Sequence, residues 1–274
     1  AYYDKSMREL MLEEQMIVRD MEFALQEGQF CIYMQPVYNL RTNQIVSAEA
    51  LVRWNHPVKG MIPPGKFIPV FERNGFVVRL DRFIWEEACR FLKASLARGG
   101  AFVPVSVNVS RLNFYNLDLI EFLLHLIKKY ELEPWMLKLE VTESAYTDNP
   151  HQLMMVVREL RMNGFSVLMD DFGSGYSSLN MLKDLPVDVL KIDMGFVREI
   201  ERSTRASAII RAIVSMAQNL EMGIVVEGVE TKPQVDFLGS IGCEDIQGYY
   251  FSRPLPEEEF NGLLIRDQQR DAAK

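Results

Sequence analysis

Short apolar segments that end in a charged or amide residue recur along this chain of 274 residues. Each has the composition of a buried β-strand, as in SVLMDD and DVLKID. Parallel strands deliver the residues at their carboxyl ends to a common rim, so these side chains are expected to line one acidic pocket. The pattern therefore predicts an enzyme. The terminal residues are Glu49, Asn108, Glu140, the pair Asp170 and Asp171, Lys191, and Glu227.

The order of the predicted elements indicates an α/β barrel. Strands are expected at residues 31–37, 45–54, 103–110, 137–144, 166–172, 188–193, 223–230 and 245–251. Helical patterns separate most of them, at residues 82–97, 117–130, 151–163, 205–221 and 232–242. Such repeated strand and helix units form parallel sheets, and about eight of them close a barrel.

The first two strands should depart from this rule. The segment between them, residues 38–44, is too short for a parallel crossover, which needs a dozen residues or more. They should form an antiparallel hairpin instead. The predicted fold is a modified TIM (β/α)8-type barrel with an antiparallel first strand.

Composition excludes several classes of protein. A net charge of −8 disfavours binding to a nucleic-acid polymer, which depends on Lys and Arg neutralising phosphates. No apolar run reaches the roughly 18 residues of a membrane-spanning helix, so no direct membrane contact is expected from this chain. Three widely spaced cysteines in apolar surroundings favour reduced packing residues and a cytoplasmic location, although a parent protein anchored in a membrane stays open.

The two ends of the chain are expected to lie outside the barrel. Residues 1–27 are rich in helix formers, and the chain begins with Ala1, so we expect a connecting helix from an upstream domain of a longer protein. The barrel is assigned to residues 28–262. Residues 263–274 are polar and are expected to form a fraying tail.

The rim residues have the chemistry of a magnesium or manganese site. Carboxylates and one amide offer only oxygen ligands, whereas the three histidines fall outside the strand-end pattern. A strand-end carboxylate such as Asp170 can bridge two ions, and Asp171 and Glu227 can complete the second site, as phosphoester displacement by two metals requires. Lys191 is expected to orient the attacking water or neutralise a phosphoryl oxygen. The glycine-rich stretch FGSGYSSL, with Ser174 between its glycines, is expected to be a mobile loop anchored by Glu143.

Several motifs in this chain, taken in order, resemble those of EAL domains, the cyclic di-GMP phosphodiesterases of bacterial signalling. The motifs are EALVRWNHPVKGMIPPGKFIP, SVNVS, LEVTES, DDFGSGYSSL, LKID, VEGVET and QGYYFSRPL, and they extend over roughly residues 28–262. The resemblance implies metal-dependent hydrolysis of cyclic di-GMP to linear pGpG. It also implies a homodimer, and an upstream regulatory or GGDEF domain in the parent protein.

The resemblance also assigns roles to individual residues. It implies that Glu49, Asn108, Glu140 and Asp170 bind metal, that Asp171 and Glu227 serve the second ion, and that Lys191 orients the water. It implies that Glu143 supports the loop after the aspartate pair. The positions matching dinucleotide contacts are Gln35, Leu51, Arg53, Asn108, Gln247 and Pro254.

Two other functions remain open. One is a receptor that binds cyclic di-GMP and signals through the N-terminal helix without turnover, which the intact ligand set disfavours. The other is an enolase-like enzyme in which strand-end carboxylates hold Mg²⁺ and Lys191 abstracts a proton. The tandem aspartates and Arg53 disfavour it, because that chemistry uses one acidic triad and a pocket for a carboxylate substrate.

Overall fold

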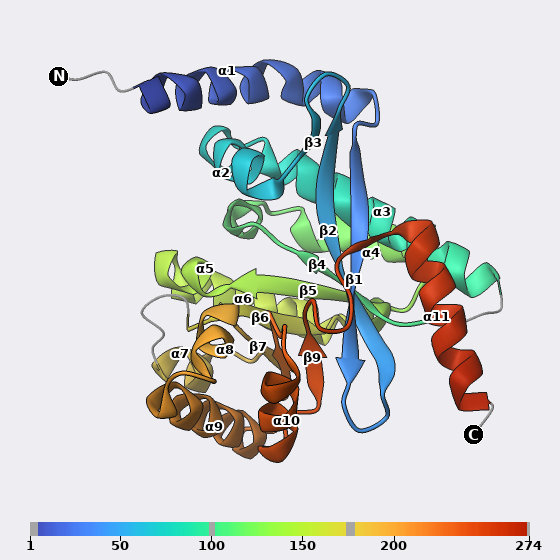
Figure 1. Ribbon diagram of the computed structural model, residues 1–274. Helices are drawn as coiled ribbons and strands as arrows, with labels where there is room; N and C mark the ends of the chain where they lie inside the picture. Colours follow the sequence, from blue (N-terminus) through green and yellow to red (C-terminus); the bar gives the residue numbers. More distant parts are fainter. Residues whose placement is uncertain (1–4, 99–101, 174–178, 273–274) are drawn as a thin grey trace.

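A closed barrel of parallel and antiparallel strands forms the centre of the molecule (Figure 1). The computed structural model describes residues 5–98, 102–173 and 179–272. Within these ranges, eight strands close the barrel in the order β1, β2, β4, β5, β6, β7, β8, β9 and back to β1. The predicted fold class is confirmed. The barrel strands are β1 (Phe30–Asn39), β2 (Gln44–His56), β4 (Val105–Asn108), β5 (Leu137–Thr142), β6 (Val167–Phe172), β7 (Val189–Ile192), β8 (Gly223–Val226) and β9 (Asp245–Gln247).

Strand β1 runs antiparallel to both of its barrel neighbours, β2 and β9. The other neighbouring strands of the barrel are parallel to each other. The hairpin pairs Phe30 with Trp54 at one end and Asn39 with Gln44 at the other, and it sets Gln35 opposite Glu49. Short strands β3 (Gly60–Ile62) and β10 (Leu255–Pro256) extend this part of the sheet beside β2 and β1.

Helices connect the parallel strands and lie outside the barrel (Figure 1). Long α1 lies beyond one end of the β1–β2 hairpin, and α3 packs against β1, β2 and β4. The α-helices are α1 (Lys5–Gln26), α2 (Pro64–Asn74), α3 (Val77–Ala97), α4 (Leu119–Lys129), α5 (Glu143–Asp148), α6 (Pro150–Met162), α7 (Leu179–Asp184), α8 (Met194–Glu199), α9 (Thr204–Asn219), α10 (Lys232–Ser240) and α11 (Glu257–Ala272). Two 3-10 turns, η1 (Arg111–Tyr115) and η2 (Pro134–Met136), complete the connections.

An aromatic cluster fixes the part of the hairpin that extends beyond the barrel. The Trp54 ring lies 5.6 Å from Phe67 and 6.0 Å from Phe71, and both of these rings belong to α2. Trp54, Phe67 and Phe71 are completely buried. Burial of an aromatic side chain contributes on the order of 2–3 kcal/mol, so α2 is held firmly against the hairpin.

The C-terminal segment differs from the sequence prediction. Residues 263–274 were expected to fray, but α11 continues through Ala272. Phe260 and Leu264 of this helix are buried, and Asp267 Oδ2 accepts a hydrogen bond of 2.8 Å from Ile45 N. These contacts anchor a segment whose composition alone is that of a solvated tail.

The last barrel strand is shorter than predicted because the chain crosses its neighbour closely at Gly248. A Cβ atom at Gly248 would lie 2.1 Å from Val229 O, so no other residue fits there without a shift. Just beyond, Tyr250 N donates to Val229 O at 3.0 Å. The strand therefore ends at Gln247, where its side chain reaches the barrel interior.

Candidate metal centre

The predicted rim residues converge at the carboxyl ends of the barrel strands. Apart from Asp170 and Asp171, which share β6, they come from different strands around the barrel and so lie far apart in sequence. Glu49 lies on β2, Asn108 ends β4, Glu140 lies on β5, Asp170 and Asp171 lie on β6, Lys191 lies on β7, Glu227 follows β8 and Gln247 ends β9. The structure therefore brings together every strand-end residue that the sequence singled out.

Lys191 lies among four carboxylates. Its Nζ is 2.6 Å from Glu140 Oε2, 2.6 Å from Glu227 Oε1, 3.0 Å from Asp170 Oδ1 and 3.3 Å from Glu49 Oε2. The lysine side chain is only 2% exposed. Burial alone would lower the pKa of Lys191, but attraction to Asp170, Glu140 and the other carboxylates raises it well above its usual value. The residue is therefore a permanent cation in this site.

Glu49 is the best-satisfied carboxylate of the group. Its oxygens accept hydrogen bonds from Gln247 Nε2 at 2.7 Å and from Asn108 Nδ2 at 3.2 Å, besides the contact with Lys191. Burial acts to raise the pKa of Glu49, but Lys191 and the amide donors outweigh it, and the net shift is downward. Glu49 is therefore held as a carboxylate.

The remaining acids carry more negative charge than one ammonium can neutralise. Burial and then repulsion by Glu49 raise the pKa of Glu140 well above its usual value. Burial raises the pKa of Glu227 to about 8 and that of Asp171 to about 6, with repulsion by Asp170 adding to both shifts. A site with this excess of carboxylates binds either protons or added cations.

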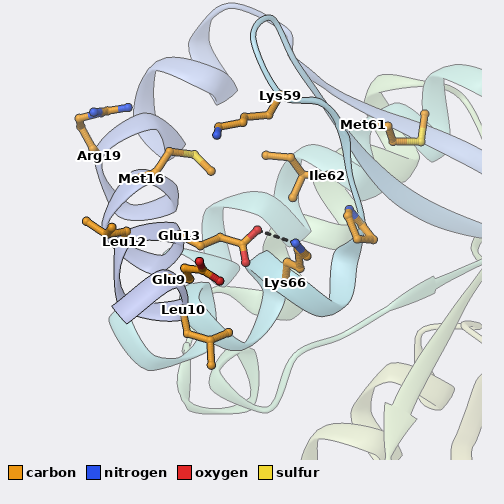
Figure 2. A pocket seen from close by; sticks show the side chains of 11 residues that line it. Glu9, Leu10, Leu12, Glu13, Met16, Arg19, Lys59, Met61, Ile62 and Lys66 are labelled. Carbon is orange, nitrogen blue, oxygen red and sulfur yellow. Dashed lines mark hydrogen bonds and ion pairs between the residues drawn. The ribbon is translucent and has the colours of Figure 1, made fainter. Parts of the chain in front are cut away.

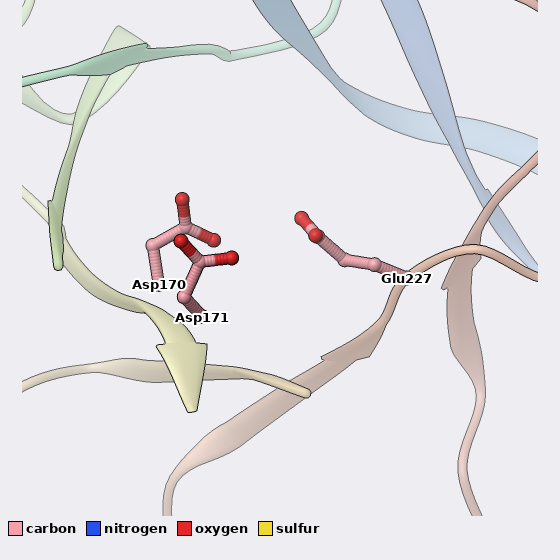
Figure 3. A group of neighbouring side chains, drawn as sticks. All are labelled: Asp170, Asp171 and Glu227. Atoms are coloured by element: carbon pink, nitrogen blue, oxygen red, sulfur yellow. The ribbon is translucent and has the colours of Figure 1, made fainter. Parts of the chain in front are cut away.

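The donor set fits divalent cations. Oxygens of Asp170, Asp171 and Glu227 lie within 4.8 Å of one another, and Figure 3 shows the aspartates of β6 facing Glu227 across a gap. Glu140 Oε1 is buried without a hydrogen-bond partner among the described residues. Hard oxygen ligands of this kind select Mg²⁺ or Mn²⁺, although they do not distinguish the two.

The backbone at the aspartate pair is unusual. Asp171 has a φ of 55°, in the left-handed region, and the register between β6 and β7 shifts between Met169 and Phe172. This irregularity lets two consecutive side chains serve the same gap, because a regular strand would point them to opposite faces. Gly173 follows, and its N donates to Glu143 Oε2 at 3.3 Å. The expected anchoring role of Glu143 fits this contact, whereas Ser174 and the rest of that loop to residue 178 lie outside the described residues.

A pocket adjoins the acidic group and contains part of the predicted substrate contacts. Its volume is about 240 Å³, and Gln35, Glu227 and Gln247 line it together with Arg198 and Tyr249. The sequence analysis did not single out Arg198 and Tyr249, because neither follows an apolar strand directly. Tyr249 does stand in the quoted motif QGYYFSRPL, whereas the signal for Arg198 was its closeness in sequence to Lys191.

The other predicted substrate contacts lie around the hairpin and the last loop. Arg53 stacks over the Tyr33 ring at 5.4 Å and donates from Nη1 to Val52 O, and the described residues contain no acid within ion-pair distance of it. Leu51 lies on β2 and Pro254 lies just before β10, each partly exposed. A half-buried guanidinium with no acidic partner is suited to a phosphate group.

A larger cavity elsewhere has a different character. Its volume is about 900 Å³, and it lies between α1, β3 and α2, where Glu13 Oε1 and Lys66 Nζ form an ion pair of 2.6 Å (Figure 2). Leu10 and Leu12 add apolar surface, and the described lining has no converging set of acids. The acidic group at the strand ends is therefore the candidate for chemistry.

Fold and site together define a class: α/β barrels with a buried group of strand-end carboxylates whose oxygens suit divalent cations. The comparison with known proteins specifies this further, since residues 18–254 match the model of the EAL domain. The chain belongs to the EAL domain family.

Two curated relatives come from Pseudomonas aeruginosa. The chain is 39% identical over 269 residues to the cyclic di-GMP phosphodiesterase NbdA, covering 98% of this chain and 34% of that protein. It is 36% identical over 259 residues to the bifunctional diguanylate cyclase/cyclic di-GMP phosphodiesterase MucR, covering 94% of this chain and 38% of that protein. The chain thus spans little more than a third of the length of these relatives.

Solved structures agree with the family assignment. The PaMucR phosphodiesterase in complex with c-di-GMP has a TM-score of 0.85 and 37% sequence identity, covering 89% of this chain and 99% of that chain. An EAL domain protein from Listeria monocytogenes has a TM-score of 0.79 and 30% identity, covering 90% of this chain and 96% of that chain.

Proposed function

We propose that this chain is a metal-dependent phosphodiesterase that hydrolyses cyclic di-GMP to linear pGpG, in the degradation of a bacterial second messenger. The observation that carries the proposal is the convergence of strand-end oxygen ligands around Lys191 in a member of the EAL domain family. The phosphodiesterase names of NbdA and MucR support the substrate.

Two groups of residues would hold two ions, Mg²⁺ or Mn²⁺. Glu49, Asn108, Glu140 and Asp170 would hold the first, and Asp170, Asp171 and Glu227 would hold the second. When bound, such ions lower the pKa of water and stabilise the negative charge of a leaving oxygen.

The side chains around this centre supply position and charge. Lys191, fixed as a cation, donates to the water that attacks phosphorus and balances charge in the transition state. Arg53 binds a phosphate of the dinucleotide, and Gln35, Leu51, Asn108, Gln247 and Pro254 contact the rest of it. Glu143 keeps the loop after Asp171 in place through Gly173 N.

The geometry argues against the enolase-like alternative. A lysine that abstracts a proton must be neutral, but the ion pairs of Lys191 raise its pKa. The receptor alternative lacks a supporting observation, because the ligand set has no missing member.

The test is incubation of the purified chain with cyclic di-GMP and Mg²⁺, Mn²⁺ or chelator, with products separated by chromatography. We expect pGpG only with added metal. The Asp170→Asn variant should give none, and Asp236→Asn, which changes an exposed carboxylate of α10, should act as wild type. Binding without product in the wild type would favour a receptor.

Partners of the parent protein are a further part of the proposal. MucR combines two activities in one chain, which supports an upstream regulatory or GGDEF domain joined through residues 1–27 to a barrel at residues 28–262. A homodimer and a cytoplasmic location are proposed on the family resemblance. No helix among the described residues has the length and apolarity to cross a membrane. Sedimentation of the purified chain over a range of concentrations tests the dimer.

A further inference from the structure

Helix α3 contacts the end of β4, where the proposed metal ligand Asn108 lies, and the segment that follows it. Two side chains one helical turn apart on α3, Asp81 and Trp85, make these contacts. Trp85 is completely buried, and Asp81 is 4% exposed. Neither residue touches the acidic centre, so the chemistry proposed above leaves both without a role.

Trp85 binds the backbone of the metal ligand itself. Its Nε1 donates a hydrogen bond of 3.0 Å to Asn108 O. The indole also packs near Phe122 of α4, with ring centroids 6.2 Å apart. The contact therefore combines ordinary packing with one directed bond to the residue that ends β4.

Asp81 binds Ser110 and Asn113, which lie two and five residues after Asn108. Its Oδ2 accepts from Ser110 N at 2.9 Å and from Asn113 Nδ2 at 2.7 Å. Asn113, which is 1% exposed, also donates to Ser110 Oγ at 3.0 Å. One buried carboxylate thus fixes the turn that leads from β4 into η1.

These contacts hold the backbone that carries the Asn108 side chain. Its Nδ2 donates to Glu49 Oε1, which leaves Oδ1 as the oxygen for an ion. On the β5 side, Val109 N donates to Glu140 O at 2.9 Å. The backbone from Asn108 to Ser110 is therefore held from both sides, by β5 and by α3.

We propose that Asp81 and Trp85 are positioning residues that fix the metal ligand Asn108 from outside the barrel, an inference that rests on the proposed function. Hydrogen bonds behind the ligands of a metal site orient those ligands, and their loss commonly reduces metal affinity. The role differs from packing alone, because it depends on one indole N–H and one carboxylate oxygen.

The chain offers a matched pair of tryptophans for the test. Trp54 is also completely buried and also donates one hydrogen bond, to Gln29 Oε1 at 3.1 Å, but it lies in the aromatic cluster of α2. Trp85→Phe and Trp54→Phe each keep an aromatic ring and remove one donor. Mn²⁺ affinity is measured by water-proton relaxation, which needs no turnover.

We expect Trp85→Phe to weaken Mn²⁺ binding roughly tenfold and to raise the Mn²⁺ concentration for half-maximal hydrolysis by the same factor. Trp54→Phe should keep the wild-type Mn²⁺ affinity. Equal Mn²⁺ affinities in the two variants would overturn the role of Trp85.

Two substitutions at Asp81 separate the effect of losing the hydrogen-bond acceptor from the effect of the side-chain volume. Asp81→Asn keeps an acceptor for Ser110 N, and its Mn²⁺ affinity should stay within about twofold of wild type. Asp81→Leu has no acceptor and should lose affinity roughly tenfold. A folded Asp81→Leu variant with wild-type affinity would overturn the role of Asp81, and if it does not fold the tryptophan pair decides. A wild type that binds Mn²⁺ but does not hydrolyse cyclic di-GMP would reject the proposed function only.

Discussion

The balance between Lys191 and the acids around it governs the chemistry of the centre. One buried ammonium contacts four carboxylates, and one of these, Glu49, is further satisfied by two amides. The other acids keep an excess of negative charge. Because the acids differ in their partners, substitutions that look equivalent in sequence should have different effects.

Substitution of Lys191 should separate stability, rate and binding. Lys191→Met leaves buried carboxylates without their cation, and breaking a buried ion pair costs about 3 kcal/mol or more. We expect the free energy of unfolding in chelator to fall by about that amount and Mg²⁺ to restore part of it. Hydrolysis should fall at least about a hundredfold, with cyclic di-GMP binding kept within about threefold. Urea denaturation, rate assays and calorimetry measure the three effects, and a defect in binding alone would contradict the role of Lys191.

Asp170 and Glu49 should respond in opposite ways. Asp170→Asn removes a charge that repels Glu140 and Glu227, so the metal-free protein should gain about 1 kcal/mol of stability while losing hydrolysis. Glu49→Ala also abolishes hydrolysis but leaves Gln247 and Asn108 without their acceptor, which costs roughly 1–3 kcal/mol. Denaturation of both variants in chelator tests this contrast. Retained hydrolysis in either variant would reject the metal assignment.

Among the elements, the end of β6 after Asp171 depends on a contact from the neighbouring connection. Glu143 begins α5 directly after β5, and it accepts from Gly173 N beyond β6. A Cβ atom at Gly173 would lie 1.9 Å from the Phe196 ring, so the chain passes closely under α8 at this point. The position of Asp171 is therefore tied to two other connections of the barrel.

Glu143→Ala should weaken this support without removing a proposed metal ligand. We expect the Mn²⁺ concentration for half-maximal hydrolysis to rise roughly tenfold, because Asp171 is held less firmly. Glu121→Ala, at an exposed position of α4, is the matched control and should keep the wild-type metal dependence. An unchanged metal dependence in Glu143→Ala would count against the anchoring role.

Sequence periodicity predicted the barrel strands and the β1–β2 hairpin, because both depend on local patterns and on the length of a connection. It did not predict α2, since Pro64 and Pro69 read as helix breakers although Pro64 occupies the first turn, where proline is tolerated. The strand pattern placed Lys191 at the rim, but it did not predict the four ion pairs of this lysine, because they form only when the barrel closes. The left-handed φ of Asp171 and the contacts of Asp81 and Trp85 likewise arise only in the folded chain.

For the whole molecule, Asp81 should affect how stability depends on pH. Burial raises the pKa of Asp81 to about 7, whereas its ordinary value is 3.8. The folded state keeps this proton to higher pH, so the contribution to the free energy of unfolding is full below about pH 4 and is lost as pH rises through about 7.

The Asp81→Asn variant removes this titration. Between pH 5 and pH 8, wild type should lose roughly 2 kcal/mol of stability more than Asp81→Asn. The acids of the proposed metal centre are the same in both proteins, so their titration cancels in this comparison. Urea denaturation at saturating Mg²⁺ across this range measures the difference. Parallel pH profiles would show that Asp81 stays ionised in the folded protein.

The reversed direction of β1 has a mechanical consequence for the whole molecule. In an all-parallel barrel the first strand starts at the end opposite the catalytic rim. Here β1 starts with Phe30 opposite Trp54, beyond the level of the rim, and runs inward past the pairing of Gln35 with Glu49. Helix α1 ends at Gln26 and β1 begins at Phe30, so the N-terminal helix joins the barrel at this end of the hairpin (Figure 1). The path from α1 to Glu49 therefore runs down β1 to Gln35 and across one strand pairing, and it does not pass through the parallel strands.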